Sequence, residues 1–475
     1  MKLEAFLRNK ENKPVVVIQG LGFVGSVMSL VVANALNGDY LVIGIDQDTE
    51  IGLKTVNILN NGEFPIIADD PKIEEYFKIV CKRGNFLATV DPAVYAEADV
   101  IIVDINLDVQ KNNNDKYELN NYSVNLESFT NAMKTIGNYC KSDALILVET
   151  TVPPGTCQKI VAPTIKNALK ERGLPVDKIR IGHSYERVMP GPNYIDSIQN
   201  FYRVYSGIDE ASADAVEVFL KTIIRTDEYP LTRLGNTNAT EMAKVLENSY
   251  RAMNIAFVVE WSRMAEEAGV DLYEAVNAIR QRPTHSNLMF PGIGVGGYCL
   301  TKDPLLASWA RINLIGGNDK LVQSEIAVSI NDQMPRYAYE FLVKRYSKTL
   351  NGVKVLLLGV SYRGDVGDTR FSPVEYFYRY LLTAGAVVST HDPYVSVWPE
   401  LNMNPYQVLK EALSDQSDIT VISTGHRIYQ REETIEILLE CKPMWIYDTI
   451  GHLSKEHLKK LQQKHKVIVL GRGDL

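Results

Sequence analysis

The feature that most constrains the fold is an apolar strand that runs directly into a glycine-rich turn. The run from Val15 to Gly25 reads VVVIQGLGFVG, and a second apolar run, Tyr40 to Ile45, ends on Asp46. In such a G-x-G-x-x-G turn, one glycine makes the bend, one lets backbone N–H groups approach a pyrophosphate, and one lets the following helix pack on the strand. An acid after the next strand can bind ribose hydroxyls, which favours NAD over NADP. The predicted cofactor contacts are Gly20, Leu21, Gly22, Phe23, Val24, Gly25 and Asp46.

The same region could be mistaken for a membrane span, because no charged residue occurs from Val15 to Leu36. Polar residues such as Gln19 and Asn34 interrupt this stretch, and another strand follows at once. We therefore predict no membrane helix here. The N-terminal residues mix both charges without an apolar core, so we also predict no secretory signal.

Composition narrows the class of protein further. A chain of 475 residues, 45% hydrophobic and 23% charged, is typical of a globular protein of about three domains. The net charge of −8 argues against nucleic acid as a partner. The five cysteines form no C-x-x-C pair, which indicates a reducing cytoplasm and no metal site.

Apolar runs alternate with helical stretches after Asp46, and this alternation predicts an α/β fold with a doubly wound sheet. The segment Asn112 to Asp115 is typical of an exposed turn. The expected buried parallel strands are Asp99–Ile105, Ala144–Glu149, Ile179–Ser184 and Tyr202–Ser206.

A long helix follows, with Thr237 or Asn238 as its cap and Gly269 as its stop. The third part of the chain repeats the first. A strand, Lys354 to Gly359, is followed by the capping box Ser372-Pro373-Val374-Glu375, by Gly385 at the helix end and by a strand closing on Asp392. Further strands are expected at Ile419–Ser423, Trp445–Tyr447 and Val467–Leu470.

These patterns predict two Rossmann-like doubly wound domains joined by a helical middle domain with a long central helix. The expected boundaries are 1–232 for the NAD-binding domain, 233–345 for the helical domain and 346–475 for the second Rossmann-like domain. The second copy lacks the G-x-G spacing, so we expect it to bind a different nucleotide-like group.

A second glycine-rich segment, Phe290 to Pro304, carries a possible nucleophile. It reads FPGIGVGGYCLTKDP, and its cysteine stands just before a helix N-terminus and a lysine. Both surroundings favour the thiolate, which is the condition for a nucleophile. Residues alone leave two alternatives open, since Cys299 could be inert core and Asp303 could simply cap the helix.

Four separated motifs together resemble the nucleotide-sugar 6-dehydrogenases of the UDP-glucose/GDP-mannose dehydrogenase family. They are the N-terminal GLGFVG, YERVMPG from Tyr185, PGIGVGGYCLTKD from Pro291 and YRGDVGDTR from Tyr362. The resemblance implies a four-electron, NAD-dependent oxidation of the C6 alcohol of a UDP-sugar to a uronic acid, UDP binding by the C-terminal domain, and a homodimer formed through the long helix.

The resemblance also implies residue roles. Cys299 becomes the nucleophile that forms a thiohemiacetal and then a thioester, while Lys244 and Asn248 stabilise the oxyanion from one face of the long helix. Glu186 and Asp303 assist the hydrolytic water, and Thr151 lies near the nicotinamide and this water. Thr151, Glu186 and Lys302 are further cofactor contacts. The implied substrate contacts are Glu186, Arg187, Lys244, Asn248, Arg282, Phe290, Gly296, Tyr362 and Arg363.

The sequence departs from the family pattern at a few positions. Arg363 replaces the usual lysine, a change compatible with bidentate pyrophosphate binding. The turn after Asp46 lacks the expected basic residue, having Glu50 and Ile51. The strand before Asn106 lacks Thr-Pro, and the segment from Asp448 to Gly451 lacks an arginine.

The motifs favour the UDP-N-acetylhexosamine branch of the family, with UDP-glucose as the alternative substrate. Two other functions are compatible with parts of the pattern. A one-step hydroxyacid-type dehydrogenase would have no need of Cys299 or of a second Rossmann-like domain. A non-catalytic nucleotide-sugar sensor would bind without turnover, and it would not need Cys299, Lys244 and Glu186 together.

Overall fold

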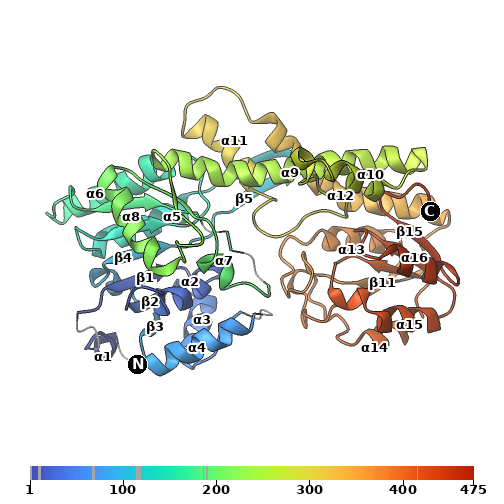
Figure 1. The fold of residues 1–475 in the computed structure, drawn as a ribbon, viewed down its shortest axis with the longest axis horizontal. Coiled ribbons are helices and arrows are strands. Elements are labelled where there is room, and N and C mark those ends of the chain that lie inside the picture. Colours follow the sequence, from blue (N-terminus) through green and yellow to red (C-terminus); the bar gives the residue numbers. More distant parts are fainter. Residues whose placement is uncertain are drawn as a thin grey trace. The chain divides into compact units, whose positions relative to one another are not determined.

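Two large sheets organise the chain, one mostly parallel and one wholly parallel, and each lies in one of two units (Figure 1). The computed structural model describes residues 3–8, 12–66, 70–113, 119–185, 187–188, 191–414 and 416–475. The first unit comprises Met1–Gln110, Ser123–Leu246 and Leu306–Lys320, and the second comprises Lys111–Tyr122, Glu247–Leu305 and Leu321–Leu475. The α/β fold class predicted from the sequence is confirmed.

The first sheet has the strand order β10-β9-β8-β7-β4-β1-β2-β3. Its strands are β1 (Val15–Gln19), β2 (Leu41–Ile45), β3 (Phe86–Thr89), β4 (Val100–Val103), β7 (Leu145–Val148), β8 (Arg180–His183), β9 (Val204–Gly207) and β10 (Thr232–Arg233). The helices of this unit are α1 (Leu3–Leu7), α2 (Phe23–Ala33), α3 (Glu50–Asn60), α4 (Pro71–Arg83), α5 (Glu127–Tyr139), α6 (Ala162–Glu171), α7 (Asp196–Gln199) and α8 (Glu210–Ile223).

Helices cover both faces of this sheet because alternate strand residues are apolar on both sides. Val16 and Ile18 of β1 pack in one core with residues of α2, α4 and α8. Val15 and Val17 pack in a second core with residues of α5 and α6. Burial on both faces explains the uninterrupted apolar strand seen in the sequence.

One strand differs from its predicted direction. β9 overlaps the predicted segment Tyr202–Ser206 from Val204 onward and ends one residue later, at Gly207, but it pairs antiparallel with β8. In the described part of the connection between β8 and β9, the helix is α7, which has four residues. This described part therefore lacks the long crossover helix that usually returns a chain to a parallel start.

The long helix α9 runs from Thr237 to Ala268, as predicted, and Gly269 follows it with φ of 71°. Its cap is Asn236, not Thr237 or Asn238. The Asn236 side-chain oxygen accepts the N–H of Ala239 at 3.0 Å, three residues on, which is the geometry of an N-cap.

The second sheet has the order β12-β11-β13-β14-β15 and is parallel throughout. Its strands are β11 (Lys354–Leu358), β12 (Val387–His391), β13 (Ile419–Ile422), β14 (Trp445–Asp448) and β15 (Lys466–Val469). The helices that follow α9 are α10 (Leu272–Arg280), α11 (Asp303–Asn313), α12 (Val322–Tyr346), α13 (Pro373–Thr383), α14 (Leu409–Ser414), α15 (Glu432–Glu440) and α16 (Lys455–Gln462).

The predicted N-cap of α13 is confirmed, because the Ser372 side chain accepts the N–H of Val374 and Pro373 is the first residue of the helix. The reciprocal bond of a capping box is not formed, since the N–H of Ser372 donates to the Thr369 carbonyl and the Glu375 carboxylate accepts from Arg379.

The structure describes only part of the segment Asn112–Asp115, which the sequence predicted as an exposed turn. Asn112 and Asn113 end strand β5 (Val109–Asn113), which pairs with β6 (Leu119–Val124), whereas Asn114 and Asp115 lie outside the described residues.

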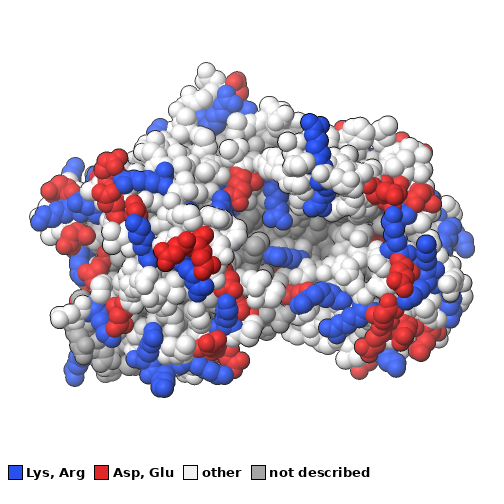
Figure 2. Space-filling view, viewed as in Figure 1, with Lys and Arg blue, Asp and Glu red and all other residues white. Residues whose placement is uncertain are grey.

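The surface carries charges of both signs. Figure 2 shows acidic and basic side chains interspersed over the face that it presents. Within the described ranges, none of the helices is both long and apolar enough to cross a membrane.

Candidate active site

The glycine-rich turn after β1 has the geometry that a pyrophosphate requires. Gly20 has φ of 96°, and a Cβ there would lie 2.5 Å from the carbonyl oxygen of Asp104. A Cβ on Gly25 would lie 1.8 Å from the carbonyl oxygen of Gly20. Gly22, in contrast, has no heavy atom near the position of a Cβ, so a ligand can approach its backbone. The turn therefore fits the dinucleotide NAD.

Asp46 follows β2 and its carboxylate lies beside this turn. Oδ2 accepts the N–H of Leu21 at 3.2 Å, and Oδ1 accepts the N–H of Gln47 at 2.7 Å. These bonds orient a half-buried carboxylate at the carboxyl end of the sheet, where it suits the ribose hydroxyls of NAD.

Asp46 is expected to determine coenzyme preference, because its negative charge repels a 2′-phosphate. Wild-type kcat/KM should be about 100-fold higher with NAD than with NADP, and Asp46→Ser should narrow this ratio about tenfold. Steady-state kinetics with both coenzymes measure it. Asp48→Ser, which removes an exposed acid two residues on, is the matched control. Equal wild-type turnover with NADP would contradict the assignment.

Glu241 and Lys244 in the first turns of α9 are buried, so these charged residues do not lie on a solvated face. Lys244 is 7% exposed, and its Nζ lies 5.5 Å from the centre of the Tyr185 ring. His183 at the end of β8 lies 2.9 Å from the hydroxyl of Thr240, and burial lowers its pKa to about 3. Because His183 is neutral, Lys244 is the cationic side chain among these four residues.

Glu241, one turn before Lys244, binds the turn that follows Thr151. Its carboxylate oxygens accept the N–H of Gly155 at 2.6 Å and the N–H of Cys157 at 2.8 Å. The side chain is fully buried, and desolvation raises its pKa to about 7 even though the backbone donors favour the charged form. Sequence reasoning missed this contact, because no local pattern pairs Glu241 with residues so distant along the chain.

Glu241 is expected to make stability pH-dependent. Its pKa in the folded state, about 7, lies above the ordinary value of 4.5, so the folded state binds the proton more tightly. The stabilisation is present below pH 4.5 and is lost as the pH rises through 7, a change of about 3 kcal/mol. Urea unfolding of the wild type and Glu241→Gln at several pH values measures this difference. Glu247→Gln, which changes an exposed carboxylate, should show the same pH dependence of unfolding free energy as the wild type. An unchanged pH dependence in Glu241→Gln would contradict the assignment.

The YERVMPG segment is described in part. Glu186 lies outside the described residues. Arg187 donates from Nη1 to the carbonyl of Tyr202 at 2.9 Å, and its guanidinium lies 5.4 Å from the Tyr185 ring centre and 5.5 Å from that of Phe201. These contacts fix Arg187 within the first unit, and its role toward a substrate stays a prediction.

In the second unit, the predicted catalytic residues around Cys299 lie together. Cys299 is exposed, and its carbonyl accepts the backbone N–H groups of Lys302 and Asp303 at the start of α11. Asp303 is fully buried. Its Oδ1 accepts from Lys302 Nζ at 2.9 Å, and its Oδ2 accepts from Asn248 Nδ2 at 2.6 Å. The aspartate side chain thus pairs with a lysine and an asparagine, and an exposed thiol lies at the same helix start.

The glycines before Cys299 press against the segment that carries Tyr362 and Arg363. A Cβ on Gly296 would lie 2.7 Å from the Cβ of Tyr362, and one on Gly297 would lie 2.8 Å from the Tyr362 ring. Gly297 also donates its N–H to the carbonyl of Arg370 at 3.1 Å. The guanidinium of Arg370, itself paired with Asp368, lies 5.2 Å from the Tyr298 ring centre. Arg370 was not predicted as a site residue, although it stands in the YRGDVGDTR motif.

Two predicted substrate residues lie elsewhere in the second unit. Phe290 stacks on Tyr273 with ring centres 5.8 Å apart, and both line a cavity of about 570 Å³. Arg282 is exposed and directly precedes a short 3-10 helix, Pro283–His285. Neither residue has a described contact with Cys299, so their roles rest on the sequence motifs.

Comparison with known proteins decides the family. The chain matches the UDP-glucose/GDP-mannose dehydrogenase family in three segments, namely the NAD binding domain over residues 14–224, the central domain over 238–328 and the UDP binding domain over 356–455. The chain belongs to this family.

Its relatives include the UDP-N-acetyl-D-mannosamine dehydrogenases of Methanococcus maripaludis, 30% identical, and of Methanocaldococcus jannaschii, 31% identical, with 98% of each chain covered in both cases. A solved UDP-D-ManNAc dehydrogenase from Pyrococcus horikoshii is 26% identical and superposes with a TM-score of 0.80, covering 97% of this chain and 100% of that one.

Family membership assigns the two segments described above to domains of known type. The protein is an NAD-dependent nucleotide-sugar dehydrogenase, in which the turn after β1 belongs to the NAD binding domain and the segment with Tyr362 and Arg363 belongs to the UDP binding domain. Across the described ranges, no cluster of His, Cys, Asp or Glu has the arrangement of a metal site.

Proposed function

We propose that this dehydrogenase oxidises the C6 hydroxyl of a UDP-N-acetylhexosamine to the carboxylate, at a cost of two NAD per sugar. The observation that carries the proposal is the exposed Cys299, which lies at the start of α11 beside the Lys302–Asp303–Asn248 cluster. A cysteine nucleophile is what a second oxidation at the same carbon requires.

The proposed chemistry uses the residue roles that the family resemblance implies. NAD, held by the glycine-rich turn after β1 and by Asp46, would supply the hydride acceptor for each of the two oxidations. After the alcohol becomes an aldehyde, Cys299 Sγ adds to C6 and Lys244 and Asn248 stabilise the oxygen anion of the thiohemiacetal. Loss of the second hydride gives a thioester on Cys299. Water activated by Asp303 and Glu186 then breaks the carbon–sulfur bond, which releases the carboxylate and regenerates the thiol.

The hydrogen bond and the ion pair of Asp303 support this assignment of roles. Because Asn248 Nδ2 donates to Asp303, the orientation of the Asn248 amide is fixed before a substrate arrives. Lys302 Nζ pairs with the fully buried Asp303 carboxylate, which we propose as the hydrogen-bond acceptor for the water. Thr151 is proposed to position that water near the nicotinamide.

The substrate is proposed from the relatives, several of which are UDP-N-acetyl-D-mannosamine dehydrogenases. The test is a comparison of UDP-N-acetylmannosamine, UDP-N-acetylglucosamine, UDP-N-acetylgalactosamine and UDP-glucose with NAD. An N-acetylated sugar should give the highest kcat/KM, with two NADH formed per sugar consumed. Preference for UDP-glucose would contradict the substrate, and one NADH per sugar would contradict the reaction.

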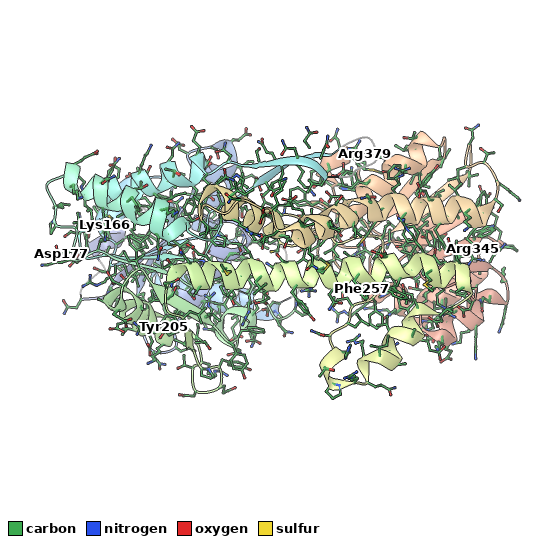
Figure 3. All side chains as sticks on the ribbon, turned by 90° about the horizontal axis from the view of Figure 1, so that it is seen from above. Lys166, Asp177, Tyr205, Phe257, Arg345 and Arg379 are labelled. Atoms are coloured by element: carbon green, nitrogen blue, oxygen red, sulfur yellow. The ribbon has the colours of Figure 1, made fainter. Side chains whose placement is uncertain are left out.

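We propose a homodimer formed through α9. Four large apolar residues on this helix, Tyr250, Phe257, Trp261 and Met264, are each about half exposed, between 47% and 59%. Their spacings of seven, four and three residues place them on one face. Figure 3 labels Phe257 on α9, and no other helix or strand is drawn in front of the helix there. Several half-exposed large apolar side chains on one helix face are typical of an interaction surface.

A charge in this stripe is expected to separate the dimer. Trp261→Lys should shift the protein to monomer at micromolar concentration, as measured by sedimentation velocity, because an ammonium would be buried without a partner. Val218→Lys, which changes an exposed apolar residue on α8, should leave the dimer intact. A monomeric wild type would contradict the proposal.

The cytoplasm is the proposed compartment. All five cysteines are free, and two of them, Cys81 and Cys299, are exposed. A catalytic thiol of this kind needs the reducing conditions of the cytoplasm to stay unoxidised.

A further inference from the structure

His426 lies in the turn after β13 and contacts the segment from Ser361 to Phe371. Its ring is fully buried. Nδ1 accepts the backbone N–H of Asp365 at 2.8 Å, and Nε2 lies 3.0 Å from Asp392 Oδ2 and 3.3 Å from the Ser361 hydroxyl. Because a backbone N–H can only donate, Nδ1 is the acceptor and Nε2 carries the hydrogen that is donated to Asp392.

Asp392 occupies the same topological position as Asp46 in the first sheet, after the second strand of a β-α-β unit. Its surroundings are different. Asp392 is fully buried, and its Oδ2 accepts the N–H groups of Val360 and Ser361 in addition to the His426 bond. Asp46, in contrast, is half-buried. In the second sheet the acid therefore binds the histidine and the backbone, and it is not available to a ribose.

The contacts of His426 lie on both sides of Arg363. Ser361 precedes this arginine by two residues and Asp365 follows it by two. The backbone at Asp365 adopts φ of 60°, and its carboxylate accepts the N–H and Nε of Arg427. The chain packs tightly here, since a Cβ on Gly364 would lie 2.2 Å from the carbonyl of Gly425. The Arg363 side chain itself is exposed.

We propose that His426 is a positioning residue for the substrate, which fixes the turn from Ser361 to Asp365 so that the exposed Arg363 meets the diphosphate of the UDP-sugar. The inference rests on the proposed function, since it requires that UDP binds beside this turn. A guanidinium binds a diphosphate in a planar, bidentate geometry, so a small rotation of the turn removes one of the two hydrogen bonds. His426 acts from behind the turn and has no contact with the diphosphate in this proposal.

Free UDP is the probe, and isothermal titration calorimetry on the full-length protein measures its affinity. His426→Phe should weaken UDP binding about tenfold or more, while the affinity for NAD stays within about twofold. With the preferred UDP-sugar, KM should rise by a similar factor and kcat should change much less, as expected for a contact remote from C6.

A matched control separates positioning from general destabilisation. His391 is a second fully buried histidine of the same sheet, and its Nδ1 lies 2.9 Å from the Tyr429 hydroxyl. His391→Phe makes the same change in a neighbouring place and should leave UDP affinity unchanged. An equal loss of UDP affinity in both variants would overturn the proposal.

Two conservative variants test the individual bonds and decide the question if the phenylalanine variant does not fold. His426→Asn keeps an acceptor near the position of Nδ1 for the Asp365 N–H, and it should recover most of the UDP affinity. His426→Gln reaches toward Asp392 but lacks that acceptor, and it should bind UDP weakly. Wild-type affinity in His426→Gln would overturn the proposal. Absence of UDP binding by the wild type would instead contradict the proposed function.

Discussion

Replacement of Cys299 by alanine is expected to abolish formation of the uronic acid. Without the thiol, no tetrahedral adduct forms at C6, so no second hydride can leave and turnover to the acid should fall by at least about 1,000-fold. Mass spectrometry of the sugar product and NADH released per sugar measure the loss. The affinities for UDP and NAD should change little, because the exposed side chain is not part of either predicted nucleotide contact.

Cys81→Ala is the matched control, because Cys81 is also an exposed free cysteine but lies on α4. It should keep wild-type activity and the ratio of two NADH per sugar. Full activity of Cys299→Ala would contradict the catalytic role and would identify Cys299 as an inert thiol. It would then favour a one-step dehydrogenase, for which one NADH per sugar is expected.

Replacement of Asp303 by alanine is expected to reduce both stability and rate. Asp303 is fully buried and pairs with Lys302, which is 9% exposed, so its removal leaves a buried ammonium without a partner. Breaking a buried pair in this way costs about 3–5 kcal/mol of unfolding free energy. The kcat should also fall about 100-fold or more, because the proposed acceptor for the hydrolytic water is lost and Asn248 loses its hydrogen-bond partner.

A double variant separates the two effects. Lys302→Met combined with Asp303→Leu replaces the ion pair by apolar side chains, and urea unfolding should show that much of the lost stability returns. The kcat should stay low, since neither side chain can accept a proton. Recovery of activity together with stability would mean that Asp303 acts only through folding.

The sequence alone determined the repeated β-α-β-acid units and the positions of most strands. The reason is local, since an apolar run followed by glycine and a cap specifies a buried strand and a helix start within about ten residues. The sequence did not predict strand direction where that direction depends on the connection between two strands. The reversed direction of β9 depends on the four-residue helix α7 in its connection, and no periodicity within β9 reports it.

For the candidate site, sequence motifs located Cys299, Asp303 and Lys302 because these residues are neighbours along the chain. Only the tertiary structure could show that Asn248, 55 residues away from Asp303, donates to the same carboxylate. The sequence of α9 likewise did not show which of its charged residues are buried. By sequence, Glu241 and Lys244 are compatible with a solvated helix face. In the structure both are buried, Glu241 against the turn that contains Gly155 and Cys157 and Lys244 beside the Tyr185 ring.

One acid follows the second strand of each β-α-β unit, and these two acids show most clearly what the sequence determined and what only the structure decided. The sequence by itself determined that Asp46 and Asp392 occupy equivalent places, because each follows an apolar strand after a glycine turn. Only the tertiary structure decided that Asp46 is half-buried beside the glycine turn while Asp392 is bound by His426. The physical reason is that the partner of a buried carboxylate is chosen by packing between distant segments, and local sequence carries no record of that choice.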